Sequence, residues 1–114
     1  MKKVIGFKFN YKNKKRTIEV EVCKNIFNQM FGLMFRKKSK PLLFVFNRKK
    51  RRAIHSFFCV PFIAIWFNDK EIIEIKKIMP WKFSVKPKKK FNKLLEIPQN
   101  SVFFNKFSDE ERNI

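Results

Sequence analysis

The sequence predicts an α+β domain, in which a compact, largely antiparallel β-sheet or barrel-like arrangement of about seven strands accompanies one short helix at about residues 25–35. Two observations lead to this prediction. Hydrophobic residues make up 45% of the 114-residue chain, which is more than a disordered protein contains even though the net charge is +19. Several segments alternate apolar and polar residues with a period of two. We therefore expect one β-rich domain over residues 1–108, followed by a short acidic tail over residues 109–114.

The first two strands are predicted from alternation. Ile5, Phe7 and Phe9 are separated by Gly6 and Lys8, and the segment 18–22 alternates β-branched residues with glutamates. This period is typical of a strand with one buried face. The polar segment 10–15 between them predicts an antiparallel hairpin.

A helix is expected next, because Asn25 suits a helix N-cap and apolar residues follow at spacings of three and four. These residues are Ile26, Phe27, Met30, Phe31 and Met34.

The second half of the chain predicts further strands separated by turn residues. The continuous apolar run 42–46 is typical of a strand covered on both faces, and the basic segment 47–52 is expected to form an exposed connection. Strands are then expected over residues 53–58, 62–67, 71–78 and 93–97, with a short helical turn within residues 99–107. One core is expected to unite Ile18, Val20, Val22, Phe44, Phe46, Ile65 and Ile75 with Phe27, Met30 and Phe31.

Several blocks of the chain resemble a known family. Gly32-Leu33-Met34-Phe35-Arg36, the apolar run 42–46, Ile54-His55-Ser56-Phe57-Phe58, Pro61 and Leu94-Leu95-Glu96-Ile97-Pro98 occur in its order and spacing. The family is the domain of unknown function family 192, also called uncharacterised protein family 0127, and the resemblance spans about residues 17–102. It implies a compact, largely antiparallel β domain and no established activity.

One difference from the family concerns a carboxylate. The family commonly places Asp two residues after the proline matched by Pro61, whereas this chain has Ile63. Any ligand role of that Asp is therefore absent here. The resemblance carries no catalytic residue over to this sequence.

Residues capable of catalysis or metal binding are few. Cys23 and Cys59 have no metal-ligand spacing and are interpreted as reduced packing residues, so no metal and no cofactor are predicted. His55 is a possible ligand or a structural side chain, and Cys59 lies roughly 13 Å further along an extended strand. Arg36 ends the most specific family block and could hold a carboxylate or phosphate, or bond backbone carbonyls behind the predicted helix.

Basic runs give the main functional indication. The chain has 28 Lys and Arg against 9 Asp and Glu, and many of these cations form short runs in predicted turns. If two runs meet at one rim of the sheet, they would attract a polyanion, of which RNA is the leading candidate. Trp81 and Phe91 flank the last run, where stacking on bases would add to phosphate contacts. The candidate polyanion-binding residues are Arg48, Lys49, Lys50, Arg51, Arg52, Lys88, Lys89 and Lys90.

Three classes of function stay open from the sequence. The first is a non-catalytic basic domain that binds nucleic acid or another polyanion, although the charge is also explained by a compositional bias toward Lys, Asn, Ile and Phe. The second is a domain that binds a small molecule or a protein partner in a pocket between helix and sheet. The third is an enzyme that uses Arg36 and His55. No segment reaches the length of a transmembrane helix and no secretory signal is recognised, so a cytoplasmic location is expected.

Overall fold

The computed structural model describes residues 3–23, 40–50, 61–79, 87–108 and 112–113, and within these the backbone forms seven strands and one short helix. The helix expected at residues 25–35 and the strand expected at residues 53–58 lie outside the described residues. The elements, in chain order, are β1 (Lys3–Tyr11), β2 (Lys14–Cys23), β3 (Leu42–Lys50), β4 (Phe62–Asn68), β5 (Glu71–Ile78), β6 (Phe91–Pro98), α2 (Val102–Ser108) and β7 (Arg112–Asn113).

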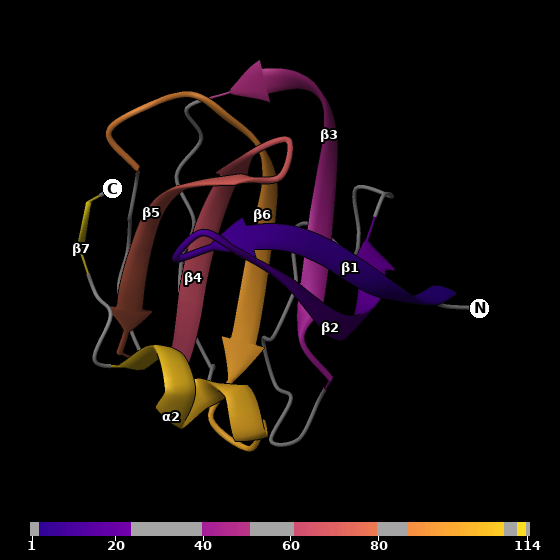
Figure 1. Ribbon diagram of the computed structural model, residues 1–114, viewed down its shortest axis with the longest axis vertical. Helices are drawn as coiled ribbons and strands as arrows, with labels where there is room; N and C mark the ends of the chain where they lie inside the picture. Colours follow the sequence, from indigo (N-terminus) through magenta and orange to yellow (C-terminus); the bar gives the residue numbers. More distant parts are fainter. Residues whose placement is uncertain (1–2, 24–39, 51–60, 80–86, 109–111, 114) are drawn as a thin grey trace.

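Six of the strands close into a mixed barrel, which confirms the predicted α+β, barrel-like fold. The sheet order is β1-β2-β3-β6-β4-β5-β7, and an additional pairing of β1 with β5 completes the barrel. Most neighbours are antiparallel, whereas β2–β3 and β1–β5 are parallel. Figure 1 shows the β1–β2 hairpin crossing in front of β3, β6 and β4, with α2 at the end of the barrel where β6 finishes.

Both predicted hairpins form, and residues with positive φ make their turns. Lys12 and Asn13 have φ of 51° and 63°, which is the signature of the two-residue turn that matches the twist of an antiparallel hairpin. Asp69, with φ of 58°, begins the turn between β4 and β5. Asn and Asp tolerate this left-handed region better than most residues do. The turn positions were therefore readable from the sequence.

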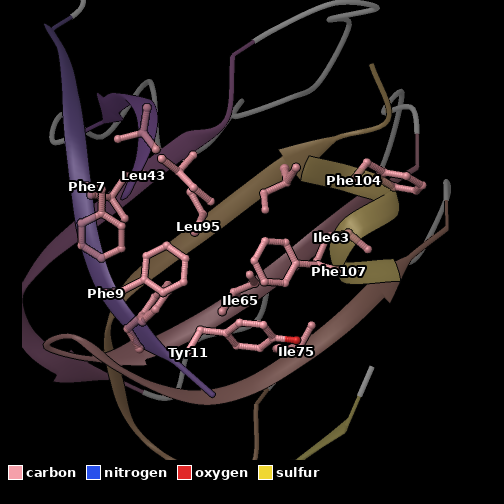
Figure 2. Close-up of a cluster of buried hydrophobic side chains, with 14 residues drawn as sticks. Phe7, Phe9, Tyr11, Leu43, Ile63, Ile65, Ile75, Leu95, Phe104 and Phe107 are labelled. Carbon is pink, nitrogen blue, oxygen red and sulfur yellow. The ribbon is translucent and has the colours of Figure 1, made fainter. Parts of the chain in front are cut away.

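The barrel interior is filled by one set of side chains, called here the inner cluster. Figure 2 shows aromatic residues of β1 packed against aliphatic residues of β4, β5 and β6, with two phenylalanines of α2 at one end. The ring of Phe7 lies 5.2 Å from that of Phe67, edge to face, and Tyr11 lies 5.1 Å from Phe107. Its buried members are Phe7, Phe9, Tyr11, Ile18, Val20, Leu43, Ile63, Ile65, Phe67, Ile75, Leu95, Ile97, Phe104 and Phe107.

A second set of apolar side chains, called here the outer cluster, lies on the opposite face of the sheet. Because successive side chains of a strand point to opposite faces, Leu43 enters the barrel while Phe44 joins the outer cluster. This confirms that the run 42–46 is covered on both faces. The single core expected from the sequence was wrong in one respect, since Phe44 and Phe46 belong to the outer cluster. Its buried members are Cys23, Leu42, Phe44, Phe62, Ala64, Trp66, Ile78, Phe91 and Leu94.

The C-terminal segment closes one end of the barrel. The Ser101 hydroxyl accepts a hydrogen bond of 3.2 Å from the amide of Phe103, which caps the start of α2. The helical turn expected within residues 99–107 is thus confirmed. Arg112 and Asn113, which the sequence placed in the acidic tail, form β7 against residues 74 and 75 of β5.

Candidate functional site

The predicted basic loop at Lys88, Lys89 and Lys90 is exposed and is anchored by a buried carboxylate. Glu74 of β5 is only 1% exposed, and its Oε1 accepts a hydrogen bond of 2.9 Å from the backbone amide of Lys88. The other oxygen of the same carboxylate lies 3.0 Å from Nζ of Lys76. Charged acceptors make the stronger hydrogen bonds. Glu74 of β5 therefore holds the backbone of the lysine loop in place just before the loop enters β6.

The second basic run lies next to the first along the backbone. β3 continues through Asn47 to Lys50, so the expectation that residues 47–52 form an exposed connection was wrong for residues 47–50. Lys50 is paired with Phe91 of β6, which follows directly after Lys90. The backbone of Lys50 therefore lies beside the start of β6, next to the lysine loop. The side chains of Arg48, Lys49 and Lys50, and the whole of Arg51 and Arg52, lie outside the described structure.

Phe91 does not provide the stacking surface that the sequence suggested. Its side chain is completely buried in the outer cluster, where its ring lies 5.5 Å from Phe46 and 6.4 Å from Trp66. A base cannot stack on a ring that has no exposed face. The second predicted stacking residue, Trp81, lies outside the described residues.

A pocket of about 390 Å³ lies between the β1–β2 hairpin and the strands β3 and β6. Its apolar lining comes from three strands, and four lysines surround it. In the sequence Lys93 ends the last basic run, residues 86–93, whereas Lys3, Lys8 and Lys70 carry no signal of a site. The pocket expected between the helix at residues 25–35 and the sheet stays a prediction, because that helix lies outside the described residues. The lining residues are Lys3, Ile5, Gly6, Phe7, Lys8, Val22, Leu43, Val45, Lys70 and Lys93.

A buried carboxyl group, also missed in the sequence, lies on the outer face of β6. Glu96 is 6% exposed and is paired with Leu42 on one side and Ala64 on the other, both members of the outer cluster. Among the described residues its carboxyl group has no hydrogen-bond or ion-pair partner. Burial raises the pKa of Glu96 to about 8, so the neutral acid is the form that this site favours.

The thiol of Cys23 is also affected by burial, which disfavours its reactive thiolate form. Its pKa is raised to about 12, mainly by burial and to a smaller extent by the nearby acidic groups of Glu96 and Glu21. The thiol donates a weak hydrogen bond to the carbonyl of Glu21 at 3.9 Å. Because the thiolate is the nucleophile and the metal ligand, the environment of Cys23 favours packing over chemistry.

Other sequence candidates lie outside the described residues. Arg36, His55 and Cys59 are among them, so their arrangement stays a prediction. Ile63, where the family commonly has Asp, points into the barrel and is completely buried in the inner cluster. Within the described part of the chain, no three His, Cys, Asp or Glu side chains are grouped as a metal would require. None of the helices described there is long and apolar enough to span a membrane.

The chain resembles proteins of one uncharacterised family. Residues 8–108 match DUF192, described as Uncharacterized ACR. A UPF0127 protein of Pyrococcus furiosus is 32% identical over 95 residues, which cover 80% of this chain and 81% of that protein. A UPF0127 protein of Pyrococcus horikoshii is 27% identical over 85 residues, covering 71% of this chain and 73% of the relative.

Two solved structures share the fold at low sequence identity. A protein of unknown function from Novosphingobium aromaticivorans has a TM-score of 0.74 and 15% identity, and the match covers 85% of this chain and 74% of that one. A protein from Sinorhizobium meliloti, described as a proposed transcription regulator, has a TM-score of 0.69 and 15% identity, with 80% and 76% covered. Both likenesses concern the fold.

Proposed function

The chain belongs to the DUF192 family, and we propose that this member is a non-catalytic binding domain for a polyanion, with single-stranded nucleic acid as the favoured partner. The binding surface is called here the basic edge. It consists of residues 48–50 at the end of β3, which Arg51 and Arg52 follow in the sequence, and of Lys88, Lys89 and Lys90 before β6.

The observation that carries the proposal is the register of β3 against β6. Lys50 is paired with Phe91, so two runs that lie about forty residues apart in the sequence come together where β3 ends and β6 begins. The hydrogen bond from Lys88 to Glu74 holds the loop in place, which reduces the ordering that binding would require. A net charge of +19 adds a long-range attraction for any polyanion.

Contacts to phosphate rather than to bases are expected to supply the affinity. Phe91 is buried, and Lys88, Lys89 and Lys90 carry flexible cationic donors, so the described part of the basic edge offers no ring for stacking and no side chain that accepts a hydrogen bond from a base. Binding should then be insensitive to sequence and strongly dependent on salt. The likeness of the Sinorhizobium meliloti structure, described as a proposed transcription regulator, is compatible with such a partner at the level of the fold.

Fluorescence anisotropy of labelled RNA and DNA oligomers at several salt concentrations tests the proposal. Each phosphate neutralised on a single strand contributes about −0.7 to the slope of log K against log salt, so the double variant Lys89→Ser, Lys90→Ser should flatten the slope by about 1.4 at most.

The matched control is the double variant Lys14→Ser, Lys15→Ser, which removes the same charge from exposed positions of β2. It should leave the slope nearly unchanged. Equal loss in the two double variants would show that binding follows the total charge and not the basic edge. Absence of binding even at low salt would refute the proposal and leave the charge as a matter of composition.

A further inference from the structure

The barrel has a seam where β1 meets β5. Within the described residues these strands are paired at one position only, Asn10 with Glu71. The amide of Asn10 donates a hydrogen bond of 3.0 Å to the carbonyl of Lys70, and its side-chain amide donates one of 2.6 Å to Oε1 of Glu71. From Asn10 back to Lys3, this edge of β1 has no paired strand in the described structure, so the barrel wall opens there.

The 390 Å³ pocket is located at this opening and has an apolar floor. Ile5, Val22 and Val45 are partly buried and pack against the inner cluster, so the floor is continuous with the barrel core. The volume lies at the small end of the range of about 300–1,000 Å³ that is usual for small-molecule sites. A compact apolar group can therefore enter without disrupting the core.

The rim of the pocket is cationic. Lys3 and Lys8 come from β1, Lys70 from the turn after β4, and Lys93 from β6, and no acidic residue is among the lining residues. Nζ of Lys93 donates a hydrogen bond of 3.4 Å to the carbonyl of Asp69 and lies 6.0 Å from the centre of the Phe7 ring. Four cations around an apolar floor concentrate positive potential at the mouth.

We propose that this pocket binds a small amphiphile with one acidic head group and an apolar body, of the class represented by medium-chain fatty acids. The lysines would hold the carboxylate at the mouth, and the apolar chain would displace water from the floor. This proposal concerns a different site from the basic edge and does not depend on binding there.

A nucleotide fits the same pocket less well. The lining side chains include lysine donors but no amide, hydroxyl or carboxylate group, so no side chain there accepts a hydrogen bond from a base. The Phe7 ring, only 7% exposed, already packs against Phe9 and Phe67 and offers little surface for stacking. The apolar floor therefore selects for hydrocarbon.

Isothermal titration calorimetry with acetate, hexanoate and octanoate tests the proposal. Octanoate should bind about fifteenfold more tightly than hexanoate, because each of its two additional methylenes contributes about fourfold when buried. Octylammonium, with the same chain and the opposite charge, should bind at least about tenfold more weakly than octanoate. Octanoate binding no more tightly than acetate would overturn the proposal.

Two matched pairs of variants locate the site. Ile5→Phe should fill the floor and weaken octanoate binding about tenfold or more. Val4→Phe places the same ring at the neighbouring, 45% exposed position outside the pocket and should leave binding unchanged. Lys3→Gln with Lys8→Gln should weaken binding about three- to tenfold, whereas Lys14→Gln with Lys15→Gln should not. If a pocket variant and its matched control weakened octanoate binding equally, the proposed location would be overturned.

An NMR titration of the native chain keeps the test independent of how the variants fold. Octanoate should shift the methyl signals of Val22, Leu43 and Val45, which line the pocket, more than those of Leu94 and Ile78 in the outer cluster. Shifts spread evenly over both sets would contradict the site. The lysines would then serve to protect the open edge of β1 from pairing with another chain.

Discussion

Replacing the buried Glu96 by Gln should change how the stability of the domain depends on pH. In the folded chain, burial raises the pKa of Glu96 to about 8, whereas an unfolded glutamate has a pKa of about 4.3. Between these values the folded state holds a proton that the unfolded state has released. The free energy of unfolding therefore falls as pH rises through this window and becomes level above it.

The size of the effect follows from the width of the window. Each pH unit within it costs about 1.4 kcal/mol, so the native chain should lose at most about 4 kcal/mol from this residue between pH 5 and pH 8. A domain of this kind has a total stability of about 5–15 kcal/mol, so the loss is measurable. Glu96→Gln has the same shape and no charge, and should remove the dependence.

Urea denaturation between pH 5 and pH 9, followed by tryptophan fluorescence, measures this difference. Trp66 lies in the same outer cluster and is completely buried, so its emission should report unfolding there. The variant should be close to the native chain in stability at pH 5 and more stable at pH 9. In the control Glu19→Gln, which removes an exposed carboxylate 2.6 Å from Lys40, the offset should be at most about 1 kcal/mol and the same at each pH. A Glu96→Gln offset that stays constant with pH would refute the assignment of a buried, neutral acid.

Two further substitutions test the outer cluster and the lysine loop. Phe44→Ala should cost about 3–5 kcal/mol in urea denaturation, because the ring is buried in the outer cluster, and a loss below about 1 kcal/mol would mean that this face is open to solvent. Glu74→Ala should cost about 1–3 kcal/mol and speed hydrogen exchange at the amide of Lys88, which loses its acceptor, and unchanged exchange there would argue against the anchor.

Local patterns were sufficient to predict most of the described strands. The alternation around Phe7 and Phe9 and the residues that favour positive φ at Asn13 and Asp69 depend on neighbours in the sequence, so they could be read directly. The end of β3 could not be read in this way. Residues 47–50 are polar and basic, as in a loop, yet they continue the strand because β6 offers a partner opposite Lys50. A strand of such composition is set by its neighbour in the sheet, not by its own propensity.

The candidate sites depended still more on tertiary structure. The four lysines of the pocket come from three separate segments, and only the barrel closure brings Lys3 and Lys8 near Lys70 and Lys93. The sequence gives only weak evidence that Glu96 is buried, namely that Leu94 lies two residues earlier and therefore on the same face of β6. That spacing indicates burial, but a lone glutamate between apolar residues in a strand more often marks the solvent face.

The topology explains why both proposed sites lie toward the same end of the barrel. β6 begins near the lysine loop and finishes at Pro98, from which the chain turns directly into α2, so that Phe104 and Phe107 occupy the far end of the core. Lys93 near the start of β6 is paired with Phe67 near the end of β4, and Figure 1 shows the start of β6 and the β4–β5 turn at the opposite end of the barrel from α2. Because the two sites share one positive field, salt should weaken binding at both, and salt dependence alone cannot assign a ligand to either. Chain-length dependence separates them, since hydrocarbon stabilises a complex only where an apolar floor receives it.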